Sequence, residues 1–181
     1  MKNSDFVWVE LTLDEMLAAF KMQESLPKKM EGNYSGDKPA KRTAGYVGQI
    51  AAAKYFGGDN VDNVHYDLLI NGKRCEVKTS TRNANPRPEY WARIAASNDS
   101  QLCDYYVFCQ TQWQHQAKEE KLMHGAHILG VLAVEEMRGV MHFMQKGEIE
   151  PGDVKPELGS CWKIACSDLV PPQYAKLLFD K

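Results

Sequence analysis

Two acidic residues and a lysine, Asp67, Glu76 and Lys78, lie around a predicted turn at Asn71-Gly72. Short runs of β-forming residues, 65–70 and 73–79, precede and follow this pair. An Asn-Gly pair in such a setting is a strong signal for a two-residue hairpin. The hairpin places Asp67 directly opposite Glu76. The two-residue period of a strand puts Lys78 on the same face as Glu76, while Cys75 and Val77 point to the other face, into a core.

This arrangement predicts a site for a divalent cation. Opposed carboxylates on a strand pair repel each other, and a bound cation removes that cost. Asp67, Glu76 and the backbone carbonyl of Val77 are hard oxygen ligands of the kind that Mg²⁺ accepts, with Mn²⁺ as a substitute. A lysine beside the metal can orient a water and stabilise charge on a phosphoryl oxygen. The alternative is an exposed hairpin whose carboxylates pair with Arg74 and Lys78.

The elements before the hairpin are predicted from their capping residues. Thr12-x-x-Glu15 forms a capping box ahead of a helix over 13–25. Residues 27–42 contain Pro, Gly and many charges and are expected to form a loop. A second helix over 44–56 has Thr43 as its cap and ends at Gly57-Gly58. The run Ala51-Ala52-Ala53 would let this helix approach a neighbour closely.

The elements after the hairpin alternate between strands and helices. We expect a basic loop at 82–88, a short helix at 89–98, strands at 105–111 and 126–134, a helix at 135–146, a loop at 147–160, a strand at 161–165 and a final helix or turn capped by Asp168. The order predicts an α/β fold with a central mixed β-sheet flanked by helices.

The spacing of Tyr66-Asp67 and Glu76-Val77-Lys78 resembles the core motif of the PD-(D/E)XK nucleases, the restriction-endonuclease-like superfamily. The helix that contains Gly45–Gln49 is similar to the first core helix of that superfamily. The resemblance implies magnesium-dependent hydrolysis of phosphodiester bonds, with Asp67 and Glu76 as metal ligands. It gives Lys78 the role of positioning water and stabilising charge.

The length of 181 residues predicts a single domain, here a nuclease domain over 1–181, and the resemblance covers roughly residues 43–170 of it. The N-terminal helix and basic loop occupy 1–42, the nuclease core 43–170 and a C-terminal extension 171–181.

Three positions bear on how closely the chain follows this family. Tyr66 stands where the motif has proline, which is a common variation. Gln49 stands where many members have glutamate; its amide oxygen can bind a metal or a metal-held water but brings no charge, which favours one metal. The alternative for Gln49 is a solvated helix residue. Gln101-x-x-x-Tyr105 matches a pattern of some exonuclease-like members.

Positive charge is concentrated in the middle of the chain. Residues 28–93 hold 12 Lys/Arg against 7 Asp/Glu, and the rest of the chain holds 10 against 17. We expect Lys41, Arg42, Arg82 and Arg87 to contact phosphates at the mouths of the site. Ordinary variation of surface charge is the alternative.

Composition excludes several classes of protein. The 181 residues are 44% hydrophobic and 25% charged, which is typical of a globular domain and not of a disordered or fibrous chain. The apolar runs are too short for a membrane span, and the first ten residues do not resemble a signal peptide. The five cysteines form no C-x-x-C pair, which favours reduced thiols in a cytoplasmic chain over a zinc site.

The sequence therefore predicts a cytoplasmic, magnesium-dependent DNA nuclease of phage or prokaryotic origin. The alternatives are a non-catalytic nucleic-acid-binding protein of the same fold, and an assembly or interaction protein with acidic flanks.

Overall fold

The computed structural model describes residues 5–25, 38–61, 65–98, 102–112, 123–149, 157 and 159–180. Its main elements are β1 (Val7–Glu10), α1 (Leu13–Ser25), α2 (Lys38–Phe56), β2 (Asp59–Asn60), β3 (Leu68–Ile70), β4 (Lys73–Arg82), β5 (Trp91–Ala95), β6 (Tyr105–Gln112), β7 (Gly125–Ala133), α3 (Met137–Val140), β8 (His142–Met144), β9 (Cys161–Ala165) and α4 (Pro172–Phe179).

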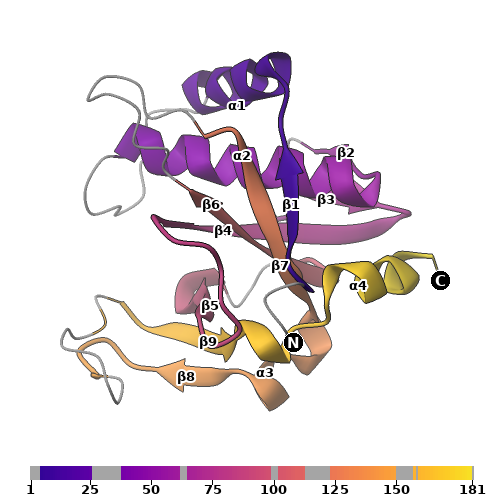
Figure 1. The fold of residues 1–181 in the computed structure, drawn as a ribbon. Coiled ribbons are helices and arrows are strands. Elements are labelled where there is room, and N and C mark those ends of the chain that lie inside the picture. Colours follow the sequence, from indigo (N-terminus) through magenta and orange to yellow (C-terminus); the bar gives the residue numbers. More distant parts are fainter. Residues whose placement is uncertain are drawn as a thin grey trace.

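The central sheet is mixed, as the sequence predicts. Its strands follow the order β1-β7-β6-β4-β3-β2, with β4 and β6 parallel and the other neighbours antiparallel. A second sheet of three antiparallel strands has the order β5-β9-β8. Helices α1 and α2 lie on one side of the central sheet, and the smaller sheet lies on the other side (Figure 1).

Each face of the central sheet has its own core. On the helical side, Val47 and Ala51 of α2 pack against Cys75, Val77 and other apolar residues of the sheet. On the opposite side, residues of β6 and β7 pack against apolar residues of β5 and β9. The prediction of a mixed sheet flanked by helices is therefore confirmed, with the addition that part of the second face is covered by β-structure.

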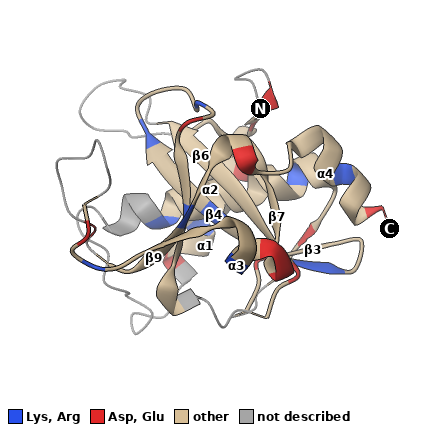
Figure 2. Ribbon diagram, turned by 90° about the horizontal axis from the view of Figure 1, so that it is seen from below, with Lys and Arg blue, Asp and Glu red and all other residues tan. Residues whose placement is uncertain are grey.

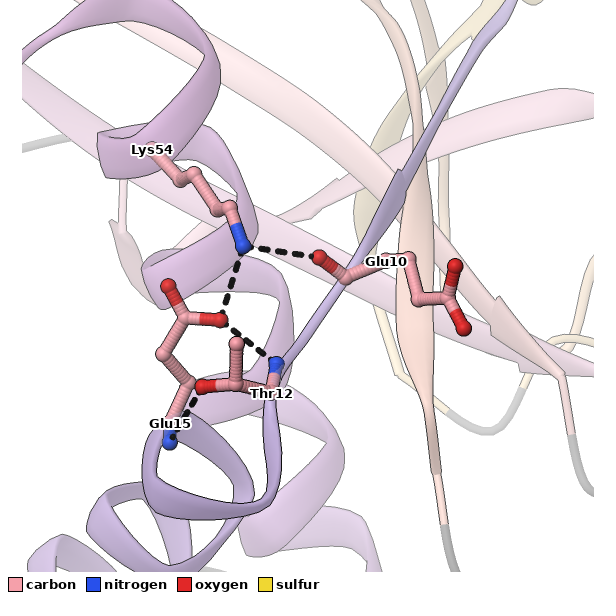
Figure 3. A network of polar contacts seen from close by, with 4 residues as sticks. All are labelled: Glu10, Thr12, Glu15 and Lys54. Atoms are coloured by element: carbon pink, nitrogen blue, oxygen red, sulfur yellow. Dashed lines mark hydrogen bonds and ion pairs between the residues drawn. The ribbon is translucent and has the colours of Figure 1, made fainter.

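The capping box at the start of α1 forms as predicted and connects this helix to α2 (Figure 3). The Thr12 amide donates to Glu15 Oε2 at 2.7 Å, and the Glu15 amide donates to Thr12 Oγ1 at 3.3 Å. Lys54 Nζ of α2 reaches the same Glu15 carboxylate at 2.9 Å and the Glu10 carbonyl at 3.0 Å. Lys54 thus ties α2 to the end of β1 and to the first turn of α1.

Helix α2 begins earlier than predicted. It starts at Lys38, so the expected loop over 27–42 is wrong for its last five residues, and Thr43 is a buried helix residue and not a cap. Pro39 in the first turn is compatible with this start, because the first amides of a helix have no intrahelical partner. The helix ends as predicted at Gly57, whose φ of 74° is the left-handed conformation that glycine adopts easily.

Close packing of α2 on the sheet depends on small residues. Ala51 and Ala52 are fully buried, which confirms the role predicted for the alanine run. A β-carbon at Gly48 would meet the Oγ1 of Thr79 on β4, with no room between them. Gly48 therefore allows α2 to lie directly against the middle of β4.

The predicted hairpin is confirmed in both turn and register. Asn71 and Gly72 have φ values of 46° and 79°, as a type I′ turn requires. Leu68 is opposite Cys75, and Ile70 is opposite Lys73, which is the predicted register. Strand β3 is shorter than the predicted run from 65, and β4 extends three residues beyond the predicted end at 79.

Three predictions of local structure are wrong. The expected helix at 89–98 is instead β5 followed by a 3-10 turn, because its residues alternate in burial and pair with β9. The expected helix at 135–146 is a 3-10 turn (Val134–Glu136) and the short α3, followed by β8, which pairs with β9. Asp168 does not cap the last helix, since α4 starts at Pro172 after Pro171.

Charged residues of both signs occupy the side of the molecule shown in Figure 2, with an acidic 3-10 turn directly before α3. All five cysteines are buried free thiols. Within the described residues, no helix is both long enough and apolar enough to span a membrane.

Candidate functional site

The predicted site lies where one edge of β4 has no neighbouring strand among the described residues. Strand β3 pairs only with Lys73–Cys75, whereas β6 pairs with β4 over Cys75–Arg82. Next to this open edge is a cavity of about 760 Å³. Its walls come from α2, β4, β5, β6 and β7, and they include Arg42, Gly45, Tyr46, Gln49, Asp67, Glu76, Val77, Lys78, Thr79, Ser80, Thr81, Arg82, Trp91, Ala92, Arg93, Ala95, Phe108, Cys109 and Leu129.

Asp67 lies just beyond the end of β3 and is held there by four hydrogen bonds, one of which runs from the Val61 amide to the Asp67 carbonyl at 2.9 Å. Its amide donates to the Cys75 carbonyl at 2.9 Å, and its Oδ2 accepts from the Val77 amide at 2.8 Å. The side-chain nitrogen of Gln49 donates to the Asp67 carbonyl at 3.0 Å. The Asp67 carboxylate thus accepts the hydrogen bond of the Val77 amide at the point where the pairing of β3 with β4 ends.

Glu76 and Lys78 share the face of β4 that is opposite α2. Their neighbours on β6 are Tyr106 and Phe108, which belong to the second core, whereas Cys75 and Val77 belong to the first. The predicted division of the strand into two faces is confirmed. The Lys78 Nζ lies 2.7 Å from Glu76 Oε1, and the side chains are only 17% and 11% exposed. This pair is therefore not the solvated surface pair of the alternative interpretation.

The electrostatics of the site show how poorly two carboxylates are tolerated here. Burial in the first place, and the negative charge of Glu76 in the second, raise the pKa of Asp67 to about 7. The hydrogen bond from Val77 and the charge of Lys78 oppose this shift without cancelling it. One lysine therefore does not neutralise both carboxylates.

The donor set fits a hard divalent cation. Asp67 and Glu76 supply carboxylate oxygens on adjoining segments, and Val77 supplies a backbone carbonyl. Because the amide and carbonyl of one residue in an extended strand point to the same edge, the Val77 carbonyl faces the open edge where its amide meets Asp67. Nowhere in the described residues, this site included, do three or more His, Cys, Asp or Glu side chains gather at a point that could hold a metal, so the site offers two carboxylates and one backbone carbonyl.

Gln49 has a positioning role in this structure. It is buried, so its interpretation as a solvated helix residue is wrong. Its partner is the carbonyl oxygen of Asp67, so the amide must present its NH₂ group to that atom. The proposed contact of its oxygen with a metal or water stays a prediction.

Two of the four residues predicted to contact phosphates line the cavity. Arg42 on α2 has a buried Nη2 atom with no hydrogen-bond partner among the described residues. The Arg82 guanidinium lies over the Tyr90 ring, 4.2 Å from its centroid. Arg87 is exposed and outside the cavity wall, 3.9 Å from a Glu89 carboxylate oxygen. The side chain of Lys41 lies outside the described part of the structure.

Two further residues of the cavity come from β5, in a segment that was expected to be helical. Arg93 faces the cavity and contacts Glu157 at 3.0 Å. Trp91 is a half-buried aromatic residue of the same wall. The alternation of Trp91-Ala92-Arg93-Ile94-Ala95 is the signal that would have identified this strand. Gln101 of the exonuclease-like pattern lies outside the described residues.

Comparison with known proteins gives no assignment: no protein-family model matches the chain, and no curated protein matches its sequence.

Proposed function

We propose that this protein is a cytoplasmic, magnesium-dependent nuclease that hydrolyses phosphodiester bonds of DNA, with an active site of the PD-(D/E)XK kind. The observation that carries the proposal is the convergence of Asp67, Glu76 and Lys78 at the open edge of β4, beside a cavity. Such a cluster of charges with little exposure has no stabilising purpose of its own, because desolvation offsets the attraction within the ion pair.

Each group of the site has a role in this proposal. Asp67 and Glu76 hold the cation, and the Val77 carbonyl completes its protein ligands. Bound Mg²⁺ would lower the pKa of a water and offset charge on the phosphoryl oxygens. Lys78 carries three donors, so its ammonium can hold a water and a phosphoryl oxygen together. Gln49 keeps the Asp67 backbone in place.

The basic residues of the cavity wall would bind the phosphates beside the scissile bond. Arg42, Arg82 and Arg93 bring three positive charges in addition to Lys78. The orphaned Nη2 of Arg42 supports this role, because a buried guanidinium donor without a partner is costly unless a ligand completes it.

Cleavage of circular and linear DNA tests the proposal directly. Mg²⁺ should support cleavage, and chelation should abolish it. Glu76→Gln should remove both metal binding and cleavage. Lys78→Met should keep metal and DNA binding but lose cleavage by about a hundredfold or more, as expected for one preorganised electrostatic group. Lys73→Met is the matched control, since Lys73 lies on the same strand outside the cavity wall.

Two results would redirect the proposal. Binding of DNA without cleavage under any metal would favour the alternative of a non-catalytic nucleic-acid-binding protein. Absence of DNA binding at low salt would reject both, and would favour the assembly or interaction protein.

A further inference from the structure

Strand β5 presents an aromatic side chain to the cavity that the proposed reaction does not use. Ala92 and Ile94 point into the second core, so the alternate residues Trp91 and Arg93 lie on the other face of the strand. Both line the same cavity as Asp67, Glu76 and Lys78. Trp91 is half-buried, so part of its ring is accessible from the cavity.

Positive charges accompany this ring. Arg93 is the next residue on the same face of β5, and the Arg82 guanidinium is held over Tyr90, the residue before Trp91. An aromatic ring combined with arginines along one wall is the combination by which proteins bind unpaired nucleotides. The bases stack on the ring, and the cations contact the phosphates.

The size of the cavity limits which nucleotides can stack on the Trp91 ring. Its volume of about 760 Å³ is in the range of pockets that enclose a small ligand. A base inside a duplex is stacked on both faces, so it offers no face to a tryptophan until it leaves the stack.

From these observations we propose that Trp91 stacks on an unpaired base beside the scissile phosphate, and that the substrate is single-stranded DNA or the unpaired end of a duplex. This inference rests on the proposed nuclease function and specifies its substrate class. It requires that the protein binds single strands more tightly than duplexes, and that Trp91 accounts for this difference in affinity.

The test is a binding measurement that does not depend on cleavage. Fluorescence anisotropy would compare a labelled 12-nucleotide single strand with a blunt hairpin duplex in Ca²⁺, and gels would confirm that both stay intact. The parent should bind the single strand at least ten times more tightly. Trp91→Ala should weaken single-strand binding by about 5- to 150-fold, the effect of losing one stacked base, and should leave duplex binding nearly unchanged.

Three variants separate stacking from folding. Trp91→Phe should keep most of the affinity, because it keeps an aromatic face. Trp91→Leu keeps an apolar side chain but should behave like Trp91→Ala. Trp8→Ala removes a tryptophan that is 40% exposed on β1, outside the cavity wall, and should bind like the parent.

A base analogue gives a second readout. 2-Aminopurine placed along the single strand should be quenched at one position by the parent and not by Trp91→Leu.

The outcomes distinguish this inference from the proposed function. Equal binding of both DNA forms, or parent-like binding by Trp91→Leu, would overturn the inference even if the protein cleaves DNA with Mg²⁺. Trp91-dependent binding of single strands without cleavage would uphold the stacking site and reject the nuclease.

Discussion

Asp67 should make metal binding depend on pH in a range where ordinary carboxylates do not titrate. Its pKa is raised to about 7 from the ordinary 3.8, first by burial and second by the charge of Glu76. A metal ligand must lose its proton before it binds, so protons compete with the metal below that value. About a tenth of Asp67 is ionised at pH 6 and about nine-tenths at pH 8, which predicts a tenfold rise in apparent affinity.

Isothermal titration with Mn²⁺ at pH 6, 7 and 8 measures this dependence. Repeating the titration at pH 6 in buffers of different ionisation enthalpy should show the release of about one proton for each metal bound. Asp67→Asn keeps an oxygen that can accept from the Val77 amide, so the fold should persist while binding is lost. Asp59→Asn is the control, because Asp59 is an exposed residue of β2.

The same proton affects the stability of the metal-free protein. The folded state holds a proton on Asp67 that the unfolded chain releases near pH 3.8. The resulting stabilisation is complete below that pH and is lost as the pH rises through about 7. Urea denaturation should therefore show a fall in stability of the parent, relative to Asp67→Asn, over this window. Metal affinity that is unchanged from pH 6 to 8, or parent-like binding by Asp67→Asn, would refute the reasoning.

Three further predictions follow from the structure. Lys78→Met leaves the little-exposed Glu76 carboxylate without its partner, so the free energy of unfolding of the metal-free protein, measured in urea, should fall by about 3 kcal/mol. Added Mg²⁺ should recover part of this loss. A variant as stable as the parent would show that the ion pair contributes nothing. Thr12→Ala removes one half of the capping box and should cost about 1 kcal/mol in thermal or urea unfolding, with cleavage unchanged. Arg42→Ala should lower the slope of log affinity for duplex DNA against log salt by about 0.9, whereas the exposed Lys146→Ala should not; equal slopes would place Arg42 away from the phosphates.

Features that depend on neighbouring residues could be predicted from the sequence. The capping box at Thr12 is set by residues three positions apart. The register that brings Asp67 to Glu76 is set by the two residues Asn71 and Gly72 and by the alternation of apolar residues on each side. The proximity of the charged residues in the site follows from this hairpin, so it could be predicted without knowledge of the rest of the chain.

Features that depend on distant pairing could not be predicted in the same way. The segment at 91–95 becomes a strand because β9, some seventy residues later, pairs with it. Because a helix was expected there, this wall of the cavity and its Trp91 could not be identified from the sequence. The contact of Gln49 with the Asp67 carbonyl depends on how closely α2 lies on β4, and the sequence does not give this packing distance.

The hydrogen bonds of the site explain why its charges stay close in the absence of metal. Asp67 is fixed by backbone bonds to β4 and by Gln49 from a helix that Gly48 allows to lie against the sheet. The protein therefore does not relieve the repulsion from Glu76 by moving Asp67 away, and the raised pKa of Asp67 favours a proton on this carboxylate instead. A cation that replaced this proton would find its protein ligands already in place, so the same repulsion that lowers stability at neutral pH would also favour metal binding.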